Sequence, residues 1–145
     1  MPPRDEVDRL LFGRDPVLST RLLRVAGGLF VLALLAYLPV RYMGTVSLTG
    51  PVVTAGLAVA MFGVAAAAAY VNDGLFVSVA LSSGVGVGFY APAIAFELQD
   101  PGDAALWVLA AGPFSSLAVG VVGFAAGAGL ARLRSSRRRA GADRR

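Results

Sequence analysis

Four long apolar stretches make up most of this chain, and none of them contains a charged side chain. They cover residues 25–40, 51–71, 75–96 and 104–131. The hydrocarbon core of a bilayer is about 30 Å thick, and about 20 apolar residues cross it as a helix. The pattern therefore predicts an all-α integral membrane bundle of four transmembrane helices joined by short loops.

Local signals set the helix boundaries. Asp15 and Pro16 form a helix start, because Asp caps free backbone N–H groups and Pro suits the first helical position. Residues 72–74 form a tight turn, because Asn, Asp and Gly tolerate left-handed conformations. We predict helices at about 16–40, 51–71, 75–96 and 104–131, a cytoplasmic N-terminal tail at 1–15, and a basic, disordered cytoplasmic tail at 132–145.

The distribution of arginine predicts the orientation of the chain. Five Arg lie in residues 1–24, seven lie in residues 132–145, and only Arg41 lies between them. Because cytoplasmic segments carry the excess of Lys and Arg, four spans with both termini inside put 12 Arg in the cytoplasm and 1 outside. A cleaved signal peptide is the competing interpretation of 25–38. We reject it because many charged residues precede this run and no A-x-A site follows it before Arg41. The predicted location is the cell membrane.

The residue types present exclude several kinds of chemistry. The chain has no His and no Cys, which removes the usual zinc, iron–sulfur and haem ligands and every Cys or His mechanism. No phosphate-binding loop or intramembrane pair of carboxylates occurs, so we expect no enzyme, no cofactor and no metal. Glu97, Asp100 and Asp103 could weakly bind a divalent cation, but such a cluster is more often only a solvated loop. All 13 basic residues are Arg, which indicates the coding bias of a GC-rich prokaryote.

Small residues follow one face of three predicted helices, at intervals of three and four. Such faces let two helix backbones approach closely in a membrane. We expect them to pack inside the bundle, with helix 16–40 more exposed to lipid; a seam for a homodimer or another membrane subunit is the alternative. The three stripes are Gly56, Ala60, Gly63 and Ala67; Gly84 and Gly88; and Gly112, Ser116, Gly120, Gly123, Gly127 and Ala131.

Two prolines fall within the predicted helices at similar depth. Pro92 and Pro113 each remove a helical hydrogen bond, and hydrocarbon cannot satisfy the freed carbonyl groups. Nearby hydroxyl groups could do so, which makes the prolines structural kinks, or a polar ligand could. The candidate ligand site comprises Gly88, Tyr90, Pro92, Pro113, Ser115 and Ser116.

These features leave two hypotheses for function. The first is a non-enzymatic packing, accessory or assembly subunit of the membrane; the second is a minimal dimeric transporter or channel for a neutral or weakly polar molecule. A polar path along Ser82, Ser83, Tyr90 and Ser115 would favour transport, whereas a dry seam would favour packing. The expected partners are the lipid bilayer and anionic lipid at the Arg tail, and we expect no nucleic acid.

Overall fold

A computed structural model describes residues 4–42, 50–96, 106 and 110–142, and their regular structure is helical. The elements are α1 (Arg4–Phe12), α2 (Pro16–Tyr42), α3 (Pro51–Asn72), α4 (Leu75–Phe96), the π-helical turn η1 (Ala110–Phe114) and α6 (Ser115–Ala142). Four helices are long and apolar enough to cross a membrane, as the sequence predicted. The predicted start of the last span at residue 104 lies outside the described residues.

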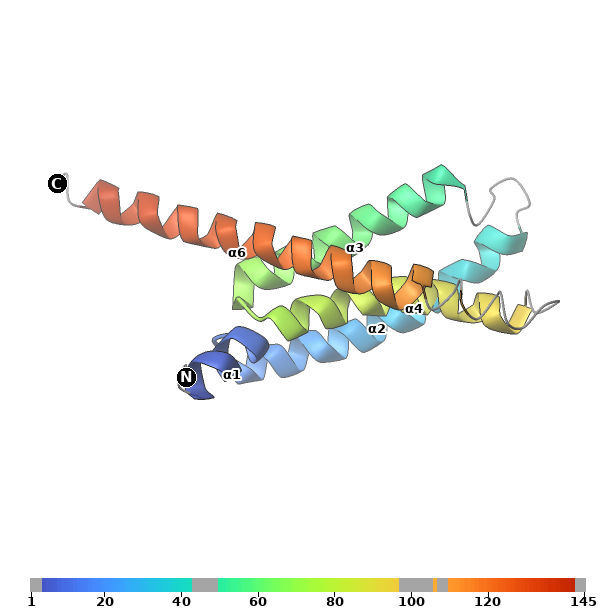
Figure 1. The fold of residues 1–145 in the computed structure, drawn as a ribbon, viewed down its shortest axis with the longest axis horizontal. Helices are drawn as coiled ribbons and strands as arrows, with labels where there is room; N and C mark the ends of the chain where they lie inside the picture. The colour runs from blue at the N-terminus through green and yellow to red at the C-terminus, as the bar shows by residue number, and fades with distance from the viewer. Residues whose placement is uncertain (1–3, 43–49, 97–105, 107–109, 143–145) are drawn as a thin grey trace.

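The predicted boundaries need one clear correction. Residues 132–145 were expected to be disordered, but α6 continues as a helix through Ala142 (Figure 1). Arginine and alanine are good helix formers, and the transmembrane segment supplies the helical nucleus that a short isolated segment lacks. At the other end of the chain, residues 4–12 of the predicted tail form the short helix α1.

Helix α4 occupies the centre of the bundle. Within the apolar span of α4, 56% of the residues are buried, against 11% in the span containing α2. Helix α2 packs along one side of α4 and α6 along another, while α2 and α3 scarcely touch. The core accordingly forms around α4, with Val77 and Leu81 against Ala26 and Ala68 in one cluster and Phe89 and Tyr90 against Tyr37 in a second.

Glycines on two faces of α4 allow this central position. A Cβ atom on Gly88 would lie 2.5 Å from the Phe30 carbonyl oxygen of α2, and one on Gly84 would lie 2.5 Å from that of Ala26. Gly86 lies on the opposite face, where a Cβ atom would overlap the Ser116 hydroxyl of α6. Side chains at these positions would hold the helices apart, so the glycines permit close backbone contact.

The small-residue stripes are used unequally. In the stripe of the last span, Gly112 lies in η1 and the other five residues lie in α6; five of the six are buried and Ala131 is half-buried. A Cβ atom on Gly123 or Gly127 would lie 2.8 Å from an alanine Cβ of α3. The stripe of α3 was also expected to pack inside the bundle, and that prediction is wrong, because its residues are all exposed: Gly56, Ala60, Gly63 and Ala67.

The outer surface is strongly apolar. Large side chains that face outward include Leu32 and Leu35 of α2, Val59 of α3 and Val122 of α6. Soluble proteins rarely expose so large a continuous apolar surface to water, whereas the hydrocarbon of a bilayer solvates it. The arrangement therefore fits an integral membrane protein.

Candidate functional site

The predicted ligand site is divided between different helix contacts. Gly88 faces α2, where it lies against Phe30, whereas Ser116 lies against Gly86 and Met61 on the other side of α4. Pro113 belongs to η1 and is exposed, and Pro92 is half-buried within α4. Among the candidate residues of α4, Tyr90 lies near η1, since a Cβ atom on Gly112 would be 3.9 Å from the Tyr90 Cβ. The candidate residues therefore do not share one described cavity.

The hydroxyl groups around Pro113 bind the backbone of their own helix. Ser116 Oγ donates to the Gly112 carbonyl oxygen at 2.6 Å, and Ser115 Oγ donates to the same oxygen at 3.2 Å. Across the bundle, the Tyr90 side chain is hydrogen-bonded to the side chain of Thr54. Both Ser hydroxyls donate to Gly112, whereas the carbonyl group that Pro113 leaves without its α-helical donor belongs to Leu109, which lies outside the described residues.

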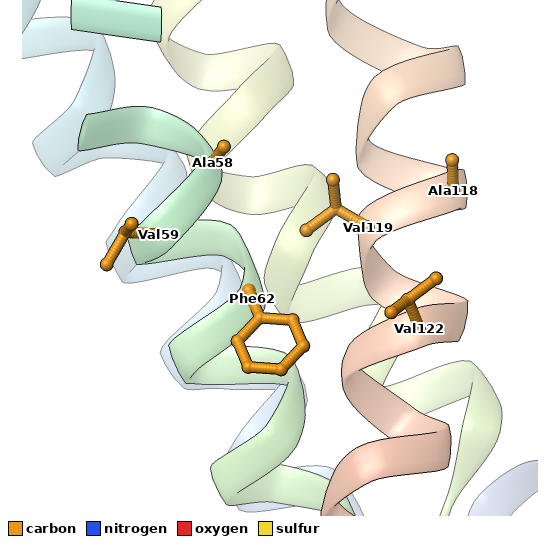
Figure 2. A pocket seen from close by; sticks show the side chains of 6 residues that line it. All are labelled: Ala58, Val59, Phe62, Ala118, Val119 and Val122. Carbon is orange, nitrogen blue, oxygen red and sulfur yellow. The ribbon is translucent and has the colours of Figure 1, made fainter. Parts of the chain in front are cut away.

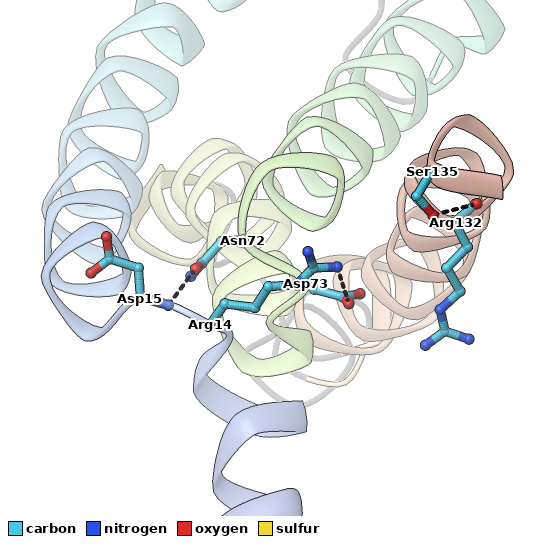
Figure 3. Close-up of polar contacts among 6 residues, drawn as sticks. All are labelled: Arg14, Asp15, Asn72, Asp73, Arg132 and Ser135. Carbon is cyan, nitrogen blue, oxygen red and sulfur yellow. Dashed lines mark hydrogen bonds and ion pairs between the residues drawn. The ribbon is translucent and has the colours of Figure 1, made fainter. Parts of the chain in front are cut away.

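A polar latch joins α3 to the N-terminal segment at one end of the bundle, which we call the basic end (Figure 3). Asn72, the last residue of α3, is 1% exposed. Its Nδ2 donates to Ser19 Oγ at 2.7 Å and to the Phe12 carbonyl oxygen at 3.2 Å. Its Oδ1 accepts from the Asp15 N–H group at 3.1 Å. Each polar atom of this side chain is therefore paired with the corner between α1 and α2.

An ion pair and a close backbone approach complete the latch. Arg14 Nη2 lies 2.9 Å from Asp73 Oδ2. Asp73 has a φ of 58°, which confirms the predicted left-handed turn between α3 and α4. A Cβ atom on Gly74 would lie 3.0 Å from the backbone nitrogen of Gly13, so the two segments touch through glycine. The Asp15 cap is also confirmed, with Oδ1 accepting from the Val17 N–H group at 2.9 Å.

A cleft of about 320 Å³, the basic cleft, lies beside the latch. Its lining comes from three separate elements: Arg14 from the α1–α2 corner, Tyr70 from α3, and Ala131, Arg134 and Ser135 from α6. Arg134 Nη1 donates to the Tyr70 hydroxyl oxygen. The sequence analysis treated these arginines only as parts of charged tails, because nothing in the sequence shows that α6 passes beside the end of α3.

The transmembrane part of the bundle has apolar grooves on its outside. One of about 410 Å³ lies between α3 and α6, where Phe62 of α3 faces Val119 and Val122 of α6 (Figure 2). Another of about 320 Å³ separates α2 from α3 and is lined by aliphatic side chains. Within the part of the chain that the structure describes, no cluster of acids could hold a metal ion. Glu97, Asp100 and Asp103 lie outside that part.

The chain matches no protein-family model, and no curated protein or solved structure is found to be similar to it. Its function therefore has to be inferred from its own residues.

Proposed function

We propose that this chain is a non-enzymatic, multi-pass protein of the cell membrane that serves as an assembly or accessory subunit. It associates with a second copy of itself through the outward face of α3. This face, the α3 seam, consists of Gly56, Ala60, Gly63 and Ala67. Both termini lie in the cytoplasm in this proposal.

The exposure of the α3 seam is the observation that carries the proposal. A Cβ atom on Gly56 or Gly63 would meet nothing within 4 Å. The helical repeat puts the seam on the opposite side of α3 from its buried Met61 and Ala65. Lipid tails solvate a large apolar side chain well, so contact with lipid does not explain why this face has only small residues. Small residues gain from a closely packed helix, because van der Waals contact drives association in a membrane.

The spacing of the seam fits a second copy of α3. Its intervals of four, three and four residues average about 3.7, the period at which two helices wind around each other with a right-handed twist, as in closely packed pairs of small-residue faces. Copies of one chain share the same orientation in the membrane. A twofold axis along the membrane normal therefore makes α3 face its own copy in parallel. Exposed Val59 and Val71 flank the seam on its two sides and could interlock across the axis.

The interior of the bundle supports a packing role over transport. Ser78 and Ser82 are fully buried, and the Ser78 hydroxyl donates to the Gly74 carbonyl of its own helix. The grooves between the spans described above are lined almost entirely by apolar side chains. A carrier for a polar molecule would need a polar route at membrane depth. The transporter alternative therefore has less support.

Disulfide crosslinking tests the seam directly, because the chain contains no native Cys. Ala60→Cys lies at the centre of the seam, and its copy should approach within disulfide range across the twofold axis. Gly28→Cys is the matched control, since Gly28 is also exposed and also has nothing within 4 Å of a Cβ atom. In native membranes under mild oxidation, we expect a covalent dimer from Ala60→Cys and only background from Gly28→Cys.

A bulky substitution provides the second arm. Gly63→Leu should lower the dimerisation constant in bilayers about tenfold, which is about 1.4 kcal/mol, while Gly28→Leu should leave it unchanged. Fluorescence transfer between labelled copies at increasing lipid dilution measures both constants. A protein that stays monomeric at every dilution, or equal crosslinking of both Cys variants, would contradict dimerisation through the α3 seam. If Ala60→Cys instead crosslinks to a different membrane protein, the accessory role survives but the homodimer does not.

A further inference from the structure

We propose that the basic cleft binds the phosphate group of an anionic phospholipid, and that an acyl chain of the same lipid lies in the adjoining groove. That groove, the Leu groove, has a volume of about 300 Å³ and is lined by Tyr70, Leu130, Leu133, Arg134 and Arg137. This site does not depend on self-association, since no residue of the α3 seam lines either space.

The basic cleft presents guanidinium groups that are already positioned. Arg134 donates one N–H to the Tyr70 hydroxyl, which fixes the direction of its planar group. A guanidinium has five N–H donors in a rigid fork, so further donors remain for a ligand. This fork matches two oxygen atoms of a phosphate. Arg134 also forms no ion pair with the residues that the structure describes.

The charge of the basic cleft favours an anion. Arg14 and Arg134 both line it, and no carboxylate does. Asp73 pairs with Arg14 through one nitrogen atom, Nη2, so it offsets one of the two positive charges. The Arg14 side chain is still 55% exposed, which leaves other N–H groups open to a ligand. A single negative charge, as on a phosphodiester, would neutralise the remainder.

The Leu groove indicates that the phosphate belongs to a lipid. Tyr70 and Arg134 form part of both spaces, so the basic cleft and the Leu groove meet along this hydrogen-bonded pair. Leu130 lies one helical turn from Arg134 on the side nearer the bundle and is exposed. A free phosphate ion would use only the basic cleft, whereas a phospholipid would fill both. Tyr and Arg at the end of a membrane span are also typical of the headgroup level.

A specific site and a loose attraction to the charged tail make different predictions. Loose attraction depends on the number of basic residues near the surface and hardly on which one is removed. A site depends on the residues that line it. Arg132 is a matched control for Arg134, because it lies two residues away on α6, carries the same charge, and lines neither the basic cleft nor the Leu groove.

Thermal unfolding of the full chain in a neutral detergent provides the assay. Dioleoylphosphatidylglycerol, dioleoylphosphatidylcholine and inorganic phosphate are titrated separately, and the apparent affinity is read from the rise in Tm. We expect a saturable rise with phosphatidylglycerol alone. Arg134→Gln should weaken this affinity about tenfold through the loss of charge-assisted hydrogen bonds, and Arg132→Gln should change it by less than about twofold.

Two outcomes would overturn the proposal. Equal losses from Arg132→Gln and Arg134→Gln would mean loose attraction to the tail. An equal rise with inorganic phosphate would mean a site for a free anion and not for a lipid. Ser135→Leu fills the basic cleft without removing a charge, so it replaces Arg134→Gln if that variant does not fold. It should cause a similar loss, and unchanged binding in a folded Ser135→Leu protein would also refute the site.

Discussion

Single residues of this chain act through contacts that are either near or far in sequence. Asp15 caps the helix that begins beside it, and its role could be predicted because a cap acts within one turn. Asn72 was predicted only as part of a turn. Its side chain binds Phe12 and Ser19, which are 60 and 53 residues away. No local pattern in the sequence links these positions, so the latch could not be predicted.

Replacing Asn72 tests the latch. Asn72→Ala removes a partner from the buried Ser19 hydroxyl and from two partly buried groups, the Phe12 carbonyl and the Asp15 N–H group. We expect the free energy of unfolding to fall by about 2 kcal/mol, as is typical when buried polar groups lose their partners. Trypsin should also cleave after Arg14 faster than in the native chain. Thr20→Ala is the control, since the Thr20 hydroxyl is exposed and donates to the Pro16 carbonyl oxygen of its own helix. Equal cleavage rates in all three proteins would mean that α1 is not held by Asn72.

The four helices themselves could be predicted, because length and lack of charge define a membrane span without knowledge of its neighbours. Their pairing could not. A stripe of small residues marks a face but does not say which helix meets it. Gly123 and Gly127 of α6 pack on α3, whereas Gly56 and Gly63 of α3 face outward. The candidate site around Pro92 and Pro113 assumed that residues at equal depth share one space, but Gly88 and Ser116 lie on different sides of α4.

A pair of matched glycine variants tests the contact between α2 and α4. At Gly88, a Cβ atom would lie 2.5 Å from the Phe30 carbonyl oxygen and 2.9 Å from the Phe30 Cα, so even alanine must push the helices apart. Gly88→Ala should lower the free energy of unfolding in detergent by about 1–3 kcal/mol. Gly28→Ala adds the same methyl group to α2 where nothing lies within 4 Å, and it should raise that energy by up to about 1 kcal/mol, because alanine favours a helix more than glycine does. Equal effects in a thermal or denaturant titration would disprove this close packing.

At the scale of the whole molecule, most of the charged residues in the described ranges lie toward one end. Helix α1, the turn between α3 and α4 and the last turns of α6 all lie at the basic end (Figure 1). The latch and the basic cleft both form there, from segments that the apolar spans bring together. An even number of spans returns the chain to the side where it started, which agrees with this arrangement. Since Arg-rich segments stay in the cytoplasm, we predict that the basic end faces the cytoplasm.

Labelling of single cysteines in intact cells tests this orientation. Thr45→Cys lies between the first two spans, and Ser136→Cys lies among the arginines of α6, where it is exposed. A maleimide that does not cross the membrane should label Thr45→Cys and leave Ser136→Cys unlabelled. After the cells are lysed, both variants should react, which controls for the accessibility of each thiol. Labelling of Ser136→Cys alone from outside would show that the orientation is the reverse of the predicted one. Labelling of both positions from outside would mean that an even number of spans lies between them. The second result would mean that at least one of α3, α4 and α6, the three helices between these positions, does not cross the membrane.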